Sequence, residues 1–232
     1  MEDPHFLVVE KPAGIPVHPL SLEDGDTLVQ RLVPDYPEIA KVGKDPREMG
    51  LAHRLDNDTS GLLLIARDQK SWVFFREEFQ KHRIEKEYEA LVLGEVKIKK
   101  DKFRIDFPIA HHPKNKKKMK VDVRRGREAV TFFSVEKIFQ GFSLLKIQIA
   151  TGVRHQIRVH LAHLGHPLVG DVLYGGEKVR LQNFPRVFLH ATRLAFRHPE
   201  TLQKIECVSK LPEDFFNVKT SQEATDSGQE HR

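Results

Sequence analysis

Alternating and continuous runs of hydrophobic residues along the chain predict mainly β-strands. Leu62–Ala66 is an uninterrupted apolar run after a polar segment, which is typical of a buried strand. From Lys86 to Leu93, apolar side chains alternate with Glu87 and Glu89, as in a strand with one face buried. Five further strands are expected, at Phe6–Val9, Phe103–Phe107, Ala129–Val135, Phe142–Ile149 and Val187–Phe196.

Helical spacing is confined to a few segments. Trp72, Phe75 and Phe79 recur at helical intervals, which predicts an amphipathic helix whose aromatic side chains pack in the core. A second helix is expected to begin near Arg154 and to end at Gly165. A short helix is expected through Leu28, Val29 and Leu32. Because strands follow one another with few helices between them, the pattern favours an α+β fold on a mostly antiparallel mixed sheet, flanked by helices and loops.

Length and composition describe a folded chain. Its 232 residues are 39% hydrophobic and include fifteen phenylalanines, enough for a sizeable core. Neither an internal repeat nor a linker divides the chain before a polar C-terminal segment. We therefore expect one domain over residues 1–218 and a disordered tail over residues 219–232.

The single cysteine, Cys207, rules out a disulfide within the chain and a zinc site built from several cysteines. The chain does not open with a segment that resembles a secretion signal, and its apolar runs are too short to cross a membrane. From these features we expect a cytoplasmic protein without a membrane partner. We also expect a monomer.

Positive charge is concentrated in one segment, although the net charge of the chain is only +5. Between Lys114 and Arg127, eight lysines and arginines are opposed by one acidic residue, Asp122. A solvated hairpin accommodates such a run, but repulsion among the charges favours a polyanionic partner such as nucleic acid. The candidate phosphate-binding residues at the centre of the run are Lys116, Lys117 and Lys118.

The segment from His53 to Gly61 admits three interpretations. Its Asx-rich sequence is typical of a tight turn, in which Asp56 and its neighbours accept hydrogen bonds from local backbone N–H groups. It also matches part of a calcium-binding loop, but the position that must supply a bidentate carboxylate is Arg67. The third interpretation is a catalytic aspartate, Asp56, on a loop at the edge of a sheet, where catalytic groups are common.

A second polar segment begins at Thr151 and continues into the helix predicted near Arg154. Arg154 and Arg158 are four residues apart, so both lie beside the apolar stripe of that helix. From there an arginine can reach into a pocket with hydrophobic walls. A carboxylate that meets such an arginine stays ionised even when it is partly desolvated.

Histidines in the same segment raise the alternative of a metal site. His160 and His163 share a helix face, and Asp171 is a possible third ligand. Neither glutamate nor cysteine lies nearby to complete such a site. We therefore expect no metal, and we favour capping or phosphate-contact roles for these histidines.

Several motifs, taken together, resemble those of the RluA-type pseudouridine synthases, which isomerise uridines in RNA. His53–Gly61 is similar to the family's catalytic motif, and the run from Thr151 to Gly175 is similar to its second motif. Lys11–Gly14, Lys86–Val92 and Leu189–Ala191 resemble its opening, tyrosine-strand and closing motifs. The similar motifs occur in the family's order over residues 5–215, which makes the resemblance specific.

The resemblance implies a role for individual residues. Asp56 corresponds to the catalytic aspartate, and Tyr88 to the tyrosine that stacks on the target base. Arg158 corresponds to the arginine that forms a salt bridge with the aspartate. Arg54 corresponds to the arginine that helps to hold the nucleotide flipped out of the RNA, and the adjacent His53 is a further candidate for an RNA contact.

Two positions of the second motif add to this assignment. Ile157 falls where the family has a hydrophobic residue packed against the tyrosine. Val153 and Arg154 stand where the family usually has arginine followed by threonine or serine, so the arginine is displaced by one residue. Because no S4-type RNA-binding domain precedes the first strand, we expect the catalytic domain and its loops to select the RNA.

The implied reaction is the conversion of uridine to pseudouridine in structured ribosomal or transfer RNA. The base leaves the sugar through nitrogen and returns through carbon without oxidation or reduction, so neither a cofactor nor a metal is expected. Asp56 either adds covalently or acts as a base at the sugar. A non-catalytic RNA-binding or RNA-chaperone role on the same fold is the alternative. A glycosidase-like hydrolase would need a second carboxylate, for which Asp58 is the nearest candidate.

Overall fold

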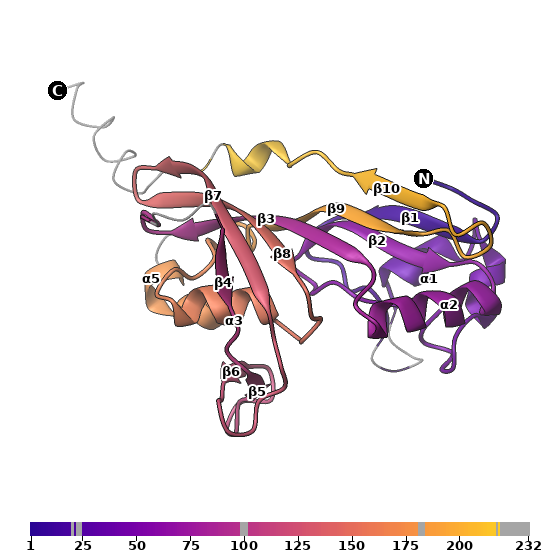
Figure 1. Cartoon of the computed structure of the whole chain (residues 1–232), viewed down its shortest axis with the longest axis horizontal. Helices are drawn as coiled ribbons and strands as arrows, with labels where there is room; N and C mark the ends of the chain where they lie inside the picture. Colours follow the sequence, from indigo (N-terminus) through magenta and orange to yellow (C-terminus); the bar gives the residue numbers. More distant parts are fainter. Residues whose placement is uncertain (20, 22–24, 98–101, 181–183, 217, 219–232) are drawn as a thin grey trace. The chain divides into compact units, whose positions relative to one another are not determined.

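A computed structural model describes residues 1–19, 21, 25–97, 102–180, 184–216 and 218, which form two compact units (Figure 1). Unit 1 comprises Met1–Tyr88, Gln148–Arg154 and Leu189–Ser209. Unit 2 comprises Glu89–Ile147, His155–Phe188 and the described residues from Lys210 onward. The predicted tail, residues 219–232, lies outside the described residues, and the single domain over residues 1–218 stays a prediction. Among the described helices, none is both long enough and apolar enough to span a membrane.

Unit 1 is built on a small mixed sheet. Strand β1 (Phe6–Lys11) pairs antiparallel with β2 (Ser60–Ala66), and β2 pairs in parallel with β9 (Leu189–Arg197). Strand β10 (Lys204–Val208) is antiparallel to β9, and β3 (Glu85–Leu93) begins in this unit. Every residue of β2 is buried, which confirms the interpretation of its apolar run.

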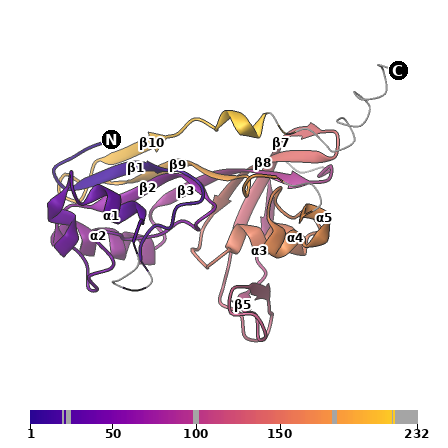
Figure 2. The ribbon, with the colours of Figure 1, turned by 180° about the vertical axis from the view of Figure 1, so that it is seen from behind.

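Helices of unit 1 are α1 (Leu28–Leu32), the 3-10 helix η1 (Pro37–Lys41) and α2 (Gln69–Gln80). Figures 1 and 2 show α1 and α2 on the same face of strands β1 and β2. The carboxylate of Asp68 caps α2 by accepting a hydrogen bond from the Ser71 N–H at 2.8 Å. Trp72 and Phe75 are buried in the core of the unit, as their helical spacing predicts.

Gly61 allows β2 to approach β9 closely. Its φ of +109° is readily adopted only by glycine, and a Cβ atom there would collide with the backbone of Ala191 on β9. We expect Gly61→Ala to lower the free energy of unfolding by more than about 3 kcal/mol, as measured by urea unfolding. Gly165→Ala is the matched control, because Gly165 also has a positive φ but open space around it. Equal losses in the two variants would contradict the importance of this contact.

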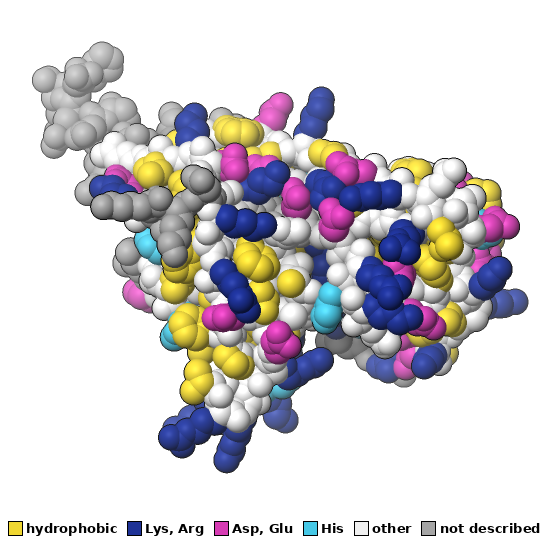
Figure 3. All heavy atoms as spheres, in the orientation of Figure 1, with side chains coloured by type: hydrophobic (Ala, Val, Ile, Leu, Met, Phe, Trp, Pro, Cys, Tyr) yellow, Lys and Arg dark blue, Asp and Glu magenta, His cyan; other side chains and the backbone are white. Residues whose placement is uncertain are grey.

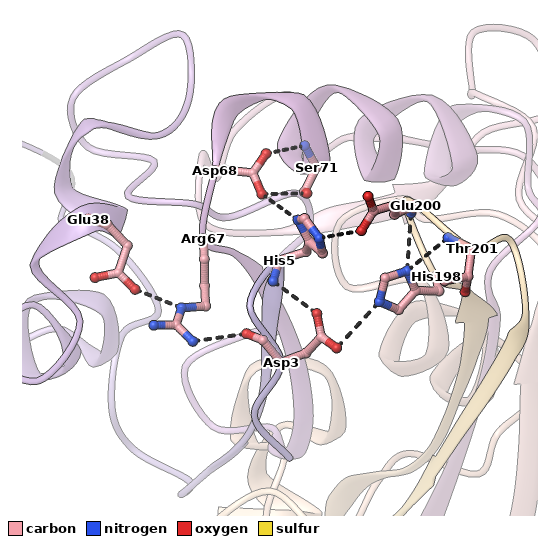
Figure 4. Close-up of polar contacts among 9 residues, drawn as sticks. All are labelled: Asp3, His5, Glu38, Arg67, Asp68, Ser71, His198, Glu200 and Thr201. Carbon is pink, nitrogen blue, oxygen red and sulfur yellow. Dashed lines mark hydrogen bonds and ion pairs between the residues drawn. The ribbon is translucent and has the colours of Figure 1, made fainter.

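The N-terminal segment is joined to the rest of unit 1 by a cluster of ionisable side chains (Figure 4). The ring of His5 lies 3.1 Å from a carboxylate oxygen of Asp68 and 2.9 Å from one of Glu200. His198 lies 3.3 Å from a carboxylate oxygen of Asp3. The hydrogen bond with Asp68 raises the pKa of His5, and it outweighs the opposing effect of burial.

A raised pKa in the folded state means that protonation of His5 favours folding. This contribution is fully present below the ordinary histidine pKa of about 6.5, and it is lost as the pH rises through the raised value. Between about pH 6 and 8, we therefore expect the free energy of unfolding to fall more for the wild type than for His5→Gln. Urea unfolding measures this, with His111→Gln at an exposed position of unit 2 as the control. Parallel profiles for wild type and His5→Gln would contradict the pairing.

Unit 2 combines antiparallel strands with short helices. Its strands follow the order β3-β8-β7-β4, with β4 at Phe103–Ile105, β7 at Thr131–Phe139 and β8 at Phe142–Ile149, the last two residues of β8 belonging to unit 1. Strands β5 (Ile109–His111) and β6 (Met119–Val121) form a separate antiparallel hairpin. Its helices are α3 (Gln156–His163), α4 (Val172–Gly175), α5 (Glu177–Arg180) and the 3-10 helix η2 (Glu213–Phe215). Buried side chains of its core include Leu91, Leu93, Phe142, Phe188 and Phe215.

The predicted α+β fold with mainly antiparallel pairing is confirmed, and the differences from the predictions are local. One face of β3 was expected to be polar, but both faces are buried from Ala90 onward, because Leu91 and Leu93 pack in the core of unit 2. Strand β4 is shorter than predicted, and β7 extends beyond Val135. The sequence pattern does not predict β10, whose residues are all exposed or half-buried.

Candidate active site

The loop that carries Asp56 is a tight turn, as its Asx-rich sequence predicts. The N–H of Thr59 donates to the carbonyl oxygen of Asp56 at 3.1 Å, and β2 begins at the next residue, Ser60. Asp56 is half-buried, whereas Thr59 and Ser60 are buried. The backbone of Asp56 is therefore held at the start of a buried strand, on a rigid scaffold of the kind that supports catalytic groups.

Lys11 fastens this turn to the end of β1. Its side chain is fully buried, and its ammonium donates hydrogen bonds of 2.7–2.8 Å to the backbone carbonyls of Pro12, Ile15 and Asn57. Burial lowers the pKa of Lys11 to about 8, and the negative charges of Asp58 and Asp56 partly offset this effect. Lys11 thus fixes the turn and places a positive charge near its two carboxylates.

Tyr88 belongs to the same unit as Asp56 and is buried in β3. Burial raises the pKa of its hydroxyl, and the negative charge of Asp56 raises it further. The phenol therefore stays protonated near neutral pH, where it can donate a hydrogen bond but does not serve as a base. The two residues lie near enough for the charge of one to act on the other.

His53 has a structural role in this unit. Its Nε2 accepts a hydrogen bond from the N–H of Leu64 at 3.0 Å, and 4.4 Å separates the centroids of its ring and the ring of Phe79. Burial lowers the pKa of His53 to about 3, and the positive charge of Lys86 lowers it as well, so the ring is neutral. Its contact with RNA stays a prediction.

Arg54 is exposed on the same loop. It makes neither a hydrogen bond nor an ion pair with another residue in the described part of the chain. Its positive charge helps to lower the pKa of the nearby His18, for which burial is the main cause. The guanidinium is thus accessible to a ligand, in keeping with its predicted role at a flipped nucleotide.

Arg158 has a partner that the sequence analysis did not assign to it. The side chain is buried in α3, and its Nε and Nη2 donate to the two carboxylate oxygens of Asp171 at 2.7 and 2.9 Å. This bidentate geometry fixes the direction of the guanidinium. Arg158 lies in unit 2, so its predicted pairing with Asp56 stays a prediction. Ile157 is buried in the same helix, and its packing against Tyr88 likewise stays a prediction.

The lysines of the basic segment lie in the turn and the second strand of the β5–β6 hairpin, whereas Arg124, Arg125 and Arg127 follow β6. At the turn, the N–H groups of Lys114 and Asn115 donate to Nδ1 of His112, and the N–H of Lys117 donates to the Asn115 side chain. Lys116 and Lys117 are exposed and Lys118 is half-buried. Figure 3 shows lysine and arginine side chains gathered at the end of this hairpin.

The four histidines near α3 contact protein groups. Ring nitrogens of His155, His160 and His166 lie 2.7, 2.8 and 2.9 Å from the Tyr174 hydroxyl, the Phe107 carbonyl and the Leu93 carbonyl. The ring of His163 packs against Phe107. Within the described residues, no group of three or more histidine, cysteine or acidic side chains is arranged to hold a metal.

Three residues have roles that sequence reasoning did not assign to them. They are Lys11, which holds the Asp56 turn, Asp171, which orients Arg158, and Lys86, which lies two residues before Tyr88 on β3. Each belongs to a motif noted in the sequence, but its role depends on contacts that residue spacing does not specify.

Known proteins with similar sequences share one family description. A family model described as RNA pseudouridylate synthase matches residues 5–163. The ribosomal large subunit pseudouridine synthase D of Haemophilus ducreyi is 37% identical over 228 residues, which cover 94% of this chain and 68% of that protein. The protein of the same name from Pseudomonas aeruginosa is 38% identical over 225 residues, covering 92% of this chain and 68% of that protein.

A solved structure shares the fold. Human RNA pseudouridylate synthase domain containing 1 has a TM-score of 0.73 to this chain at 24% identity, covering 98% of this chain and 92% of that one. At this identity the likeness concerns the fold alone.

Proposed function

We infer that this chain, which belongs to the RNA pseudouridylate synthase family, acts on a uridine of large-subunit ribosomal RNA with Asp56 as its catalytic carboxylate. As a member of the family, the chain is an RNA pseudouridine synthase, an isomerase of RNA uridine. The proposed RNA target is supported by similarity to two relatives, each named ribosomal large subunit pseudouridine synthase D. They are 37% and 38% identical to this chain over nearly its whole length.

The proposed chemistry gives Asp56 and Tyr88 separate tasks. The bond between N1 and C1′ of uridine breaks, a bond between C5 and C1′ forms, and the proton on C5 is lost while N1 gains one. Asp56 serves as the nucleophile or as a base at the sugar, and either role requires the ionised carboxylate. Tyr88, buried and protonated, stacks on the base and donates its hydroxyl proton to a hydrogen bond. The proton lost from C5 is balanced by the one gained at N1, so the composition of the nucleotide is unchanged and the reaction consumes no second reactant.

Two arginines complete the proposal. Arg158 acts as the counter-charge of Asp56, a role that rests on the sequence resemblance. Arg54 occupies the space that the flipped uridine leaves in the RNA, and its exposure supports this role. Extrusion of the base has an energetic cost of a few kcal/mol, which such a contact offsets in part.

The proposed function is tested with RNA that contains [5-³H]uridine. Each conversion replaces the C5–H bond, so tritium passes into water. We expect release from large-subunit ribosomal RNA and none from transfer RNA. Release from transfer RNA alone would overturn the proposed target. Tight binding of ribosomal RNA without any release would favour the non-catalytic RNA-binding alternative.

The basic hairpin is proposed to bind RNA phosphates. Replacing Lys116, Lys117 and Lys118 with glutamine should weaken binding at low salt, because each lost phosphate contact removes about 0.7 to 0.9 from the slope of log affinity against log salt. The chemical step on saturating RNA should barely change, since phosphate contacts position the substrate. RNA affinity across a salt series measures the effect.

A matched variant controls for net charge. Replacing Lys97, Lys137 and Lys146 with glutamine removes the same charge from exposed positions of unit 2 outside the hairpin. Equal slopes for the two triple variants would show that the hairpin is only a solvated surface.

A further inference from the structure

Lys86 is a half-buried cation whose ammonium has no hydrogen-bond acceptor among the described residues. It makes neither a hydrogen bond nor an ion pair with any residue that the structure describes. The Lys86 nitrogen lies over the ring of Phe79, 5.5 Å from its centroid. Burial lowers the pKa of Lys86 to about 8, and no negative charge of the described residues counteracts this effect. The ammonium is thus desolvated and uncompensated.

Lys11 in the same unit shows how a buried lysine is normally accommodated. Its ammonium donates to three backbone carbonyls, and two carboxylates partly compensate its charge. Lys86 has neither kind of support in the described part of the chain. Burial of a charged group is strongly unfavourable unless it is paired, so an unpaired ammonium points to an anion supplied from outside the chain.

Lys86 lies in the neighbourhood of the proposed uridine site. It precedes Tyr88 by two residues on β3, so the two side chains leave the same face of the strand. The charge of Asp56 acts on Tyr88, and the charge of Lys86 acts on His53, the residue before Arg54. The ammonium therefore lies near His53, on the face of β3 that carries Tyr88.

Gly152 leaves space beside this ammonium. A Cβ atom at Gly152 would lie 3.7 Å from the Lys86 nitrogen, so a longer side chain there would extend over the charge. The φ of Gly152 is outside the left-handed region, so residues with side chains can adopt its conformation. What distinguishes glycine at this position is therefore the space that it leaves.

We propose that Lys86 binds a phosphodiester group of the RNA strand next to the target uridine, with the space at Gly152 as its access. This inference rests on the proposed function, because the RNA substrate supplies the phosphate while Asp56 and Tyr88 mark the place of the base. A phosphodiester carries a full negative charge and can therefore serve as the counter-charge of the ammonium. The contact is separate from those of the hairpin lysines, and it positions the strand at the reacting nucleotide.

The first test uses Lys86→Met and a synthetic stem-loop taken from the ribosomal RNA segment that the wild type modifies. We expect RNA affinity to fall by about 10-fold or more and the slope against log salt to fall by about 0.7 to 0.9. The KM should rise while kcat on saturating RNA stays within a few-fold. Lys86→Arg should retain most of the affinity. Lys70→Met, an exposed position on α2, controls for the loss of one charge.

Stability separates loss of binding from loss of folding. Because Lys86→Met removes an uncompensated buried charge, we expect its melting temperature to equal or exceed that of the wild type. Gly152→Val should reproduce the loss of affinity without any change of charge, because its side chain covers the ammonium.

The second test places single neutral methylphosphonate linkages around the target uridine. At one position, the neutral linkage should weaken RNA binding by the wild type about as much as the Lys86→Met substitution does. The same linkage should not weaken RNA binding by Lys86→Met any further. Wild-type affinity and salt slope in Lys86→Met, or equal effects of every linkage on both proteins, would overturn the inference. If the wild type converts no uridine in any RNA, the proposed function fails. If it is active and Lys86→Met matches it throughout, only the role of Lys86 fails.

Discussion

Purified Asp56→Asn is expected to form no measurable pseudouridine, a loss of at least about 10⁴-fold in kcat, while RNA affinity stays within a few-fold. Asparagine keeps the shape of the side chain, but it neither attacks carbon nor accepts a proton as a carboxylate does. The turn should persist, because its hydrogen bond joins Thr59 N–H to the backbone oxygen of Asp56 and not to the side chain. Single-turnover conversion and RNA binding, measured on the same RNA, separate chemistry from affinity.

Asp58→Asn is the matched control for this experiment. Asp58 is the other carboxylate of the same turn, and its charge also acts on Lys11. We expect this variant to retain activity within about 10-fold, because the proposed reaction needs one carboxylate. If Asp58→Asn were inactive while Asp56→Asn stayed active, the catalytic carboxylate would be Asp58. This result would contradict the proposed role of Asp56.

Tyr88→Phe should lower the single-turnover rate by about 10²-fold, with RNA affinity little changed. The hydroxyl is buried and stays protonated, because burial and the charge of Asp56 both raise its pKa. Its loss therefore removes a hydrogen-bond donor at the reacting base, while the aromatic ring still stacks. Tyr88→Ala removes the ring as well, and we expect a further loss of rate and weaker RNA binding.

The control for Tyr88→Phe is Tyr36→Phe, which removes a hydroxyl that bonds Glu2 at the surface. This variant should keep the wild-type rate. Full activity in Tyr88→Phe would restrict Tyr88 to stacking, and full activity in both Tyr88 variants would remove the residue from the site.

Local patterns predicted much of this fold. The apolar run of β2 and the aromatic spacing of α2 depend on neighbours in sequence, and both elements were found where expected. The parallel pairing of β2 with β9 was not predicted, because it joins residues as distant as Ser60 and His190, which are 130 positions apart. Neither strand carries a signal in its own sequence for such a partner.

The candidate site was predicted less completely, for a related reason. Asp56 stands out because its turn and strand are both visible in the sequence. Lys11 and Lys86 were not assigned roles from the sequence. The role of Lys11 depends on the directions of backbone carbonyls. The role of Lys86 depends on the lack of a hydrogen-bond acceptor among the described residues. The Arg158–Asp171 pair depends on how the chain turns after α3, which residue spacing does not specify.

The central claim is that Asp56 of this chain converts a uridine of large-subunit ribosomal RNA to pseudouridine. The most direct measurement maps pseudouridines in total RNA from cells that lack the gene and are supplied with the wild type, with Asp56→Asn, or with neither. We predict that at least one pseudouridine in large-subunit ribosomal RNA is present only with the wild type. An identical pseudouridine map in all three strains, or full restoration by Asp56→Asn, would contradict the claim.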